Sequence, residues 1–151
     1  MIIPNLLVAD MDRSIAFYRD LLGMEVTMSV DAEQGYSEGE LRPGSIFAGL
    51  QWQGAQIMLQ TRESLAAELV EVEVGPPGGV WGTVFIRGYD PDPIVDRAPA
   101  EARIKGPGTT WYGMRELTLR DPDGHLVTLA TPAQGAPGEG PAEAAHGAAG
   151  H

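Results

Sequence analysis

The chain contains no cysteine. This excludes disulfide bonds, thiolate metal sites and cysteine nucleophiles together. Long apolar runs are also absent, since none approaches the roughly 20 residues that a membrane-spanning helix needs. The first residues, MIIPNLLVAD, lack the basic region and the cleavage site of a secretory signal. We therefore expect a cytoplasmic protein with no membrane partner.

Basic residues are scarce. Ten lysine and arginine residues stand against 21 aspartate and glutamate residues, which gives a formal net charge of -11. The summed field of such a chain repels phosphate backbones, so we expect no nucleic-acid partner. The acidity has two interpretations: it keeps the protein soluble, or it serves a cleft that attracts cations.

Large apolar side chains are missing from the end of the chain. Residues 133–151 are mostly alanine, glycine and proline, which cannot offset the entropy cost of ordering, so we expect a disordered tail. His146 and His151 lie in this tail, and a metal site there is the alternative to plain disorder. The rest of the chain has the length of one domain.

The segment IIPNLLVAD is apolar and rich in residues that favour strands, and the spacing of apolar residues becomes helical after it. Asp10 or Asp12 is predicted to cap a helix that runs to Leu22, and Gly23 supplies a left-handed stop. One apolar face of this helix follows a 4-3-4 spacing: Met11, Ile15, Tyr18 and Leu22.

Three strands are predicted after this helix. Val26, Met28 and Val30 alternate with other residues, which predicts a strand with these three side chains on one side. After a polar loop at 31–44, SIFAGLQW and AQIMLQ flank Gln-Gly at 53–54, a hairpin signal. A short helix, RESLAAEL, and a Gly-Pro cluster at 75–79 follow.

The order of elements recurs in the second half. A strand GTVFIRGYD, a helical stretch shortened by Pro93 and Pro99, and the strands ARIKG, MRELTLRD and HLVTLAT are predicted in turn. Asp10 and Asp90 lie eighty residues apart, and each closes a strand before a helical segment. We therefore predict an α+β fold of two βαβββ modules, one at 1–61 and one at 81–132, joined by a linker at 62–80.

Two blocks, LLVADMDRSIAFYRDLLGMEV near the start and WYGMRELTLRDPDGHLVTLATP near the end, resemble the vicinal oxygen chelate superfamily. This superfamily includes glyoxalase I, extradiol dioxygenases, fosfomycin-resistance enzymes and bleomycin resistance proteins. The resemblance implies one domain at 1–132, in which the curled sheets of both modules surround a shared cleft that a second subunit commonly completes. A homodimer is therefore expected.

The resemblance also implies four metal-ligand positions, which metal-dependent members fill with His, Gln or Glu. By offset from the matching blocks they fall on Ile3, Met58, Thr83 and Thr128, and a shift of two at the second position offers Gln60. An aliphatic chain, a thioether and two hydroxyls cannot hold a divalent cation against water. We therefore expect no metal and no cofactor.

Two ionisable residues near the end of the chain, His125 and Glu116, are candidates for a functional role. His125 follows Asp-Gly, which predicts a solvated turn residue. Glu116 is predicted either to face the cleft as a cation-binding or proton-transfer carboxylate or to form an ion pair across strands. Tyr112 joins it as a weak candidate for acid-base work.

Tryptophan and tyrosine gather at predicted loops, where such rings wall a pocket for planar or cationic ligands or pack a subunit interface. The predicted ligand-binding residues are Phe47, Trp52, Met58, Gln60, Trp81, Thr83, Phe85, Trp111, Tyr112, Glu116 and Thr128.

Three hypotheses for function follow. The first is a metal-free homodimer similar to the bleomycin resistance proteins, which holds a planar or cationic small molecule in an acidic, aromatic-lined cleft. The second is a lyase, isomerase or dioxygenase of the same superfamily with a relocated metal or an acid-base site. The third is a module whose cleft serves only its own dimerisation.

Overall fold

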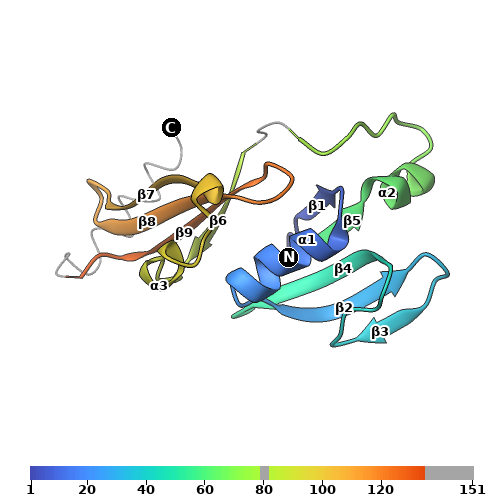
Figure 1. Cartoon of the computed structure of the whole chain (residues 1–151), viewed down its shortest axis with the longest axis horizontal. Coiled ribbons are helices and arrows are strands. Elements are labelled where there is room, and N and C mark those ends of the chain that lie inside the picture. Colours follow the sequence, from blue (N-terminus) through green and yellow to red (C-terminus); the bar gives the residue numbers. More distant parts are fainter. Residues whose placement is uncertain (79–81, 135–151) are drawn as a thin grey trace. The chain divides into compact units, whose positions relative to one another are not determined.

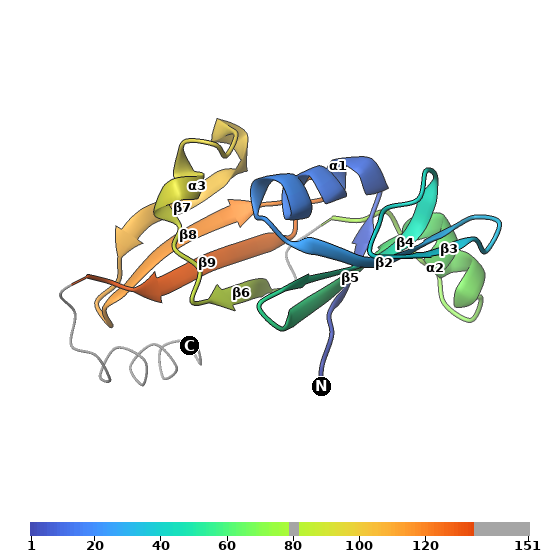
Figure 2. The same cartoon turned by 90° about the horizontal axis from the view of Figure 1, so that it is seen from below.

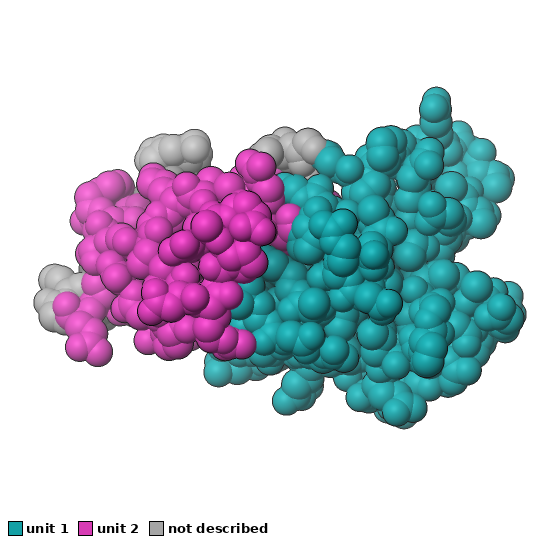
Figure 3. Space-filling view, viewed as in Figure 1, with its two compact units in different colours: residues 1–79, 122–124 teal, residues 80–121, 125–151 magenta. Residues whose placement is uncertain are grey.

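The computed structural model describes residues 1–78 and 82–134. The chain divides into two compact units (Figure 3): unit 1 comprises Met1–Gly79 with Pro122–Gly124, and unit 2 comprises Val80–Asp121 with His125–His151. Trp81 and almost all of the predicted tail, with its two histidines, lie outside the described residues. The single domain at 1–132 stays a prediction.

Unit 1 contains a five-stranded sheet in the order β1-β5-β4-β2-β3 (Figure 1). Its elements in chain order are β1 (Asn5–Val8), α1 (Met11–Ile15), the π-helical segment η1 (Ala16–Leu21), β2 (Glu25–Asp31), β3 (Tyr36–Glu38), β4 (Ser45–Trp52), β5 (Ala55–Thr61) and α2 (Arg62–Glu68).

Most of the prediction for the first helix is confirmed. Asp10 is the N-cap, its side chain accepting from the Arg13 N–H at 3.2 Å, and Gly23 stops the helix at φ 76°. The whole predicted apolar face is buried. The second half differs, because the Leu22 N–H donates to the Phe17 carbonyl five residues back, as in a π-helix.

A β-bulge in β2 changes which side chains share a face. Val26 lies opposite Leu50, whereas Met28 lies opposite Gly49 and Val30 opposite Phe47. The extra residue leaves Val26 on the face of buried Leu50, while Met28 and Val30 point to the other face. The prediction that Val26 shares a side with Met28 and Val30 is therefore wrong, because a shift of one residue reverses the alternation.

The predicted hairpin at 53–54 is confirmed, with Gln53 at φ 46° and Gly54 at φ 83°. The predicted loop at 31–44 contains the short strand β3 and is fixed by an ion pair. Arg42 Nε donates to Asp31 Oδ2 at 2.9 Å, and Asp31 Oδ1 accepts from the Gly35 N–H at 2.8 Å. These hydrogen bonds lower the pKa of Asp31, and the bond from Arg42 is the largest cause.

Unit 2 contains a four-stranded sheet in the order β6-β9-β8-β7. Its elements are β6 (Thr83–Arg87), α3 (Asp92–Val95), the 3-10 segment η2 (Ala100–Ala102), β7 (Arg103–Thr109), β8 (Met114–Arg120) and β9 (Leu126–Pro132). The predicted shortening by proline is confirmed: Pro93 lies in the first turn of the four-residue α3, and Pro99 precedes η2.

The two sheets share one topology. The strands β1, β5, β4 and β2 of unit 1 correspond to β6, β9, β8 and β7 of unit 2, and in each unit the first and last strands run parallel. Two βαβββ modules and the α+β class are thus confirmed.

Each sheet packs one face against helices of its own unit (Figure 2). The core of unit 1 includes Leu6, Val8, Leu50 and Leu59 beneath Ile15, Tyr18 and Leu22; that of unit 2 includes Leu117, Leu119, Val127 and Leu129 with Ile94. We call the other face, turned away from α1 or α3, the far face of each sheet. None of the helices in the described ranges is long and apolar enough to cross a membrane.

Candidate functional site

The far face of the unit 1 sheet carries three of the predicted ligand-binding residues. Met58 and Gln60 alternate with buried Ile57 and Leu59 along β5, and Phe47 of β4 lies opposite Gln60. Phe47, Met58 and Gln60 therefore share one face of the sheet. Trp52, the last residue of β4, is half-buried beside the hairpin turn.

Gln60 is buried and its amide is fully engaged. Its Oε1 accepts from Asn5 Nδ2 at 2.9 Å, and its Nε2 donates to Ser64 Oγ and to Glu68 Oε2, both at 3.0 Å. These bonds tie β1, β5 and α2 together. The side chain therefore holds its own unit together, and its Oε1 already accepts one hydrogen bond.

The far face of the unit 2 sheet brings together the other predicted residues. Phe85, Thr128, Thr118 and Lys105 form one row across all four strands, and Glu116 and Ala130 belong to the next row. Thr83 lies on the same face at the start of β6 and is exposed. Thr118 is an addition that the sequence reasoning missed.

The four inherited metal positions do not fit a divalent ion. Ile3 precedes β1, Met58 offers a thioether, and Thr83 is an exposed hydroxyl. Thr128 is buried, and its hydroxyl is hydrogen-bonded to Thr118 Oγ1 at 2.9 Å. Within residues 1–78 and 82–134, no group of three or more His, Cys, Asp or Glu side chains is placed to hold a metal ion. These donors lack the charge and basicity that such an ion requires.

A pocket of about 340 Å³ lies at the end of the far face of unit 2. It is lined by Lys105, Gly106, Gly108, Thr109, Thr110, Trp111, Tyr112, Glu116 and Thr118. The β7–β8 turn builds one wall: the Gly113 N–H donates to the Thr110 carbonyl at 3.0 Å, and Gly113 adopts φ 81°. This turn presents two consecutive aromatic rings at its tip.

The two rings are held edge to face. The Trp111 and Tyr112 centroids lie 5.2 Å apart at an interplanar angle of 86°, and Tyr112 packs over the buried pair Met114 and Ala130. Trp111 itself is 79% exposed. An indole this exposed on an anchored turn is available to a ligand or a partner chain.

Glu116 makes its hydrogen bond to Tyr112 and no ion pair within the described part of the chain. The Tyr112 hydroxyl donates to Glu116 Oε1 at 2.8 Å, and Oε2 has no protein partner among the described residues. Burial, with the hydrogen bond to Glu116 as a further cause, raises the pKa of Tyr112 above its ordinary value of 10.0. Tyr112 therefore stays protonated near neutral pH and acts as a donor, not as a base.

His125 and its neighbours correct one expectation. His125 belongs to the turn before β9, as predicted, but it is buried: its N–H donates to Asp121 Oδ1 at 2.8 Å. The next carboxylate, Asp123, was missed. It accepts from the Ala9 N–H at 2.9 Å and from Ser14 Oγ at 3.1 Å, and so fixes the start of α1. No local signal predicts such a long-range contact.

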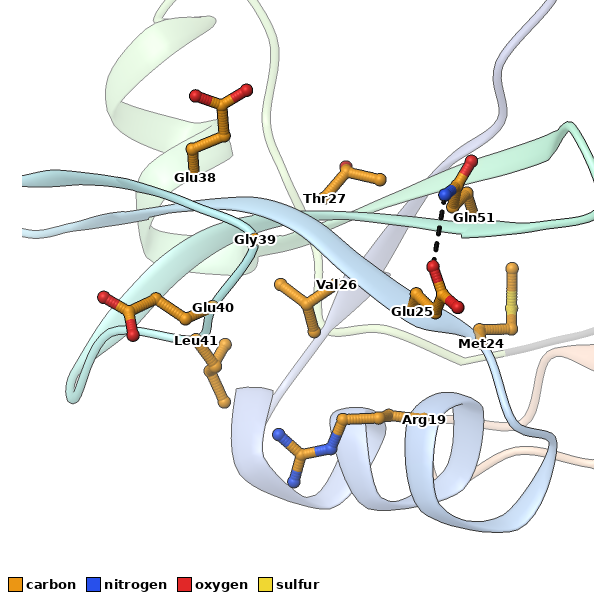
Figure 4. A pocket seen from close by; sticks show the side chains of 10 residues that line it. All are labelled: Arg19, Met24, Glu25, Val26, Thr27, Glu38, Gly39, Glu40, Leu41 and Gln51. Atoms are coloured by element: carbon orange, nitrogen blue, oxygen red, sulfur yellow. Dashed lines mark hydrogen bonds between the residues drawn. The ribbon is translucent and has the colours of Figure 1, made fainter.

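A second hollow, of about 900 Å³ in unit 1, was also missed (Figure 4). Val26 and Leu41 point toward the helical segment that carries Arg19, whereas Glu38 and Gln51 lie on the opposite side of β2. Arg19 is already paired with Asp20 at 2.7 Å. The polar groups that line this unit 1 hollow do not converge on one point. The unit 2 pocket is therefore the candidate site.

Comparison with known proteins places the chain among relatives of one fold. The family model described as the glyoxalase/bleomycin resistance protein/dioxygenase superfamily matches residues 3–59. No curated protein matches the chain.

Three solved structures are similar. A protein of unknown function from Agrobacterium tumefaciens str. C58 is 22% identical, with 87% of this chain and 92% of that chain covered and a TM-score of 0.65. TioX from Micromonospora sp. ML1 is 19% identical, with 87% and 97% covered and a TM-score of 0.62. A glyoxalase/bleomycin resistance protein/dioxygenase from Nocardioides is 20% identical, with 92% and 89% covered and a TM-score of 0.59. At these identities the structures show the fold alone.

Proposed function

We propose that this chain, of which residues 3–59 match the model of the glyoxalase/bleomycin resistance protein/dioxygenase superfamily, binds a planar small molecule in the unit 2 pocket and releases it unchanged. The observation that carries this proposal is Trp111, an exposed indole held edge-on by Tyr112 beside Glu116. A planar ligand stacked on this indole removes apolar surface from water on both partners.

Glu116 orients the ligand in this proposal. Its Oε1 is held by Tyr112, and its Oε2 is free to accept from a donor or cationic group of the ligand. Thr118 adds a hydroxyl to the same wall. The lining thus combines two aromatic rings with polar groups that can orient a ligand, a combination found in small-molecule pockets.

Dimerisation is part of the proposal. Leu7, Phe47 and Met58 are half-exposed on the far face of unit 1, and Phe85 is 47% exposed on that of unit 2. A second copy would cover such apolar surface. Light scattering at micromolar concentrations should give twice the chain mass of 16.1 kDa. A monomer at all concentrations would contradict this part.

Bleomycin, a cationic antibiotic, is the first probe. In a Trp52→Phe/Trp81→Phe variant, Trp111 is the only tryptophan, since the chain has three. We expect saturable quenching of its fluorescence. Trp111→Ala in the wild-type background should weaken binding on the order of 50-fold, from about 100 Å² of lost stacking area. No quenching at millimolar bleomycin would count against this ligand class.

The enzymatic alternative has a separate readout. Tyr112 is a donor, which leaves Glu116 as the acid-base candidate of the pocket. Mass spectrometry of the probe after long incubation should recover it unchanged. A converted probe, or a stoichiometric metal content that survives dialysis, would favour the enzyme.

A further inference from the structure

The charge of the chain is unequally divided between the units. Unit 1 carries thirteen acidic and four basic side chains, whereas the described part of unit 2 carries six of each. The net charge therefore says little about the pocket, because the pocket lies in the half of the chain where the charges balance.

Cations gather on the far face of the unit 2 sheet. Lys105 lies opposite Thr118, Arg120 follows Thr118 by two residues on the same side, and Arg87 ends the row of Glu116 and Ala130. Among the strand residues of this face, Glu116 is the one acid. None of the three cations has an ion-pair partner within the described ranges.

Lys105 is the cation that reaches the pocket. It is the single lysine of the chain, and it lines the same cavity as Trp111 and Glu116. It is exposed and forms no ion pair with Glu116. The residues that line the cavity thus include a lysine, a tryptophan and a glutamate. Arg120, two residues beyond Thr118 on the same face of β8, adds to the positive field.

We propose that the ligand of this pocket is an amphoteric planar molecule whose anionic group, a carboxylate or a phosphate, is bound by Lys105. This inference rests on the proposed function and sharpens it. The ring stacks on Trp111, a donor group faces Glu116 Oε2, and the anion faces Lys105. A purely cationic ligand can still stack on Trp111, but it leaves Lys105 without a partner and binds less tightly.

A matched pair of probes tests the anionic contact. 3-(2-Naphthyl)alanine and 2-(2-naphthyl)ethylamine share a ring and an ammonium group and differ by one carboxylate. By calorimetry at low salt, the amino acid should bind about fivefold more tightly than the amine, the size of one exposed charge pair. The preference should shrink as salt is raised. Binding of 2-naphthyl phosphate shows whether a phosphate group can take the place of the carboxylate at Lys105.

Three variants locate the contact. Lys105→Gln should abolish the fivefold preference, and Lys105→Arg should keep it. Arg103→Gln is the matched control, because Arg103 lies on the same strand opposite buried Leu119, on the other face. It makes the same change of charge and should keep the preference. Acetylation of amines should abolish the preference in the wild type, as Lys105→Gln does. It should leave the preference of the Lys105→Arg variant unchanged.

The outcomes separate the two proposals. If both probes bind through Trp111 with equal affinity, or if Lys105→Gln keeps the preference, the anionic contact is refuted and the planar-ligand proposal stands. If none of the three naphthyl probes binds at millimolar concentration, both proposals fail.

Discussion

The two sheets are built to the same plan, yet their far faces differ. In unit 1 this face is apolar around Phe47 and Met58, and its buried polar group, Gln60, is consumed by its own unit. In unit 2 the face carries exposed charges and ends in a pocket with an exposed indole. The fold therefore fixes the helix-covered faces and leaves the far faces free to diverge, so function has to be sought on the far faces.

The largest expected effect tests whether the two units fold as one domain. Leu59 and Leu129 occupy corresponding strands, and both are 0% exposed. Leu59→Ala and Leu129→Ala should each lower the free energy of unfolding by about 3 kcal/mol. In urea titrations followed by fluorescence and circular dichroism, both variants should move one common transition. Two transitions, each moved by only one variant, would show two domains.

A smaller effect tests how closely β7 approaches β8. Gly106 adopts φ 89°, and a Cβ there would lie 2.5 Å from the Glu116 carbonyl oxygen. Gly106→Ala should cost about 2 kcal/mol of stability and distort the pocket. Gly23→Ala in unit 1 is the control, at φ 76° with open space around the Cβ, and should cost about 1 kcal/mol. Equal losses in urea denaturation would contradict the close approach.

The contact made by Asp123 should matter less. Asp123→Ala removes the acceptor of the Ala9 N–H and of Ser14 Oγ, and should cost about 1 kcal/mol of unfolding free energy. Ser14→Ala removes one of these two bonds and should cost less. A thermal midpoint of Asp123→Ala equal to that of the wild type would show that the turn 122–124 does not support α1.

The weakest of these effects is a loss of stability at acidic pH, caused by protonation of Asp31. Because Arg42 and two backbone N–H groups lower the pKa of Asp31 below its ordinary 3.8, the folded state favours the carboxylate. This stability is present above the unfolded pKa and is lost as pH falls through the folded pKa. The advantage of the wild type over Asp31→Asn in urea midpoint should therefore shrink from pH 6 to pH 3. Asp92→Asn, which removes the more exposed pair with Arg115 in unit 2, should change little.

Much of the fold could be predicted because its signals are local. The spacing of Met11, Ile15, Tyr18 and Leu22, the Gln-Gly turn and the recurrence at Asp90 each need only a short window of sequence. The bulge in β2 and the π-helical second half of the first helix could not be predicted in this way. The bulge depends on which residues pair across the strands, and the π-helical segment depends on whether an N–H bonds four or five residues back. Both are decided by tertiary packing.

The site was predicted less completely. Trp111, Tyr112 and Glu116 were named from turn position and alternation, and the structure places them in one pocket. Lys105 was missed, because its strand has register shifts between Arg103 and Lys105 and between Lys105 and Gly108, which hide the face on which Lys105 lies. A net charge of -11 also favoured an acidic cleft, although a sum cannot show where the charges lie. Ligand binding at these residues stays a prediction.

The helix α2 has no buried side chain and is held to its sheet by the Gln60 amide and by its Thr61 cap. Opening this helix therefore exposes little that water does not already reach. Its amide hydrogens should exchange with solvent long before those of the strands, and proteases should cut the chain at α2 before they cut the strands. The α2 segment should thus tolerate an inserted tag or a nick with less damage than either sheet.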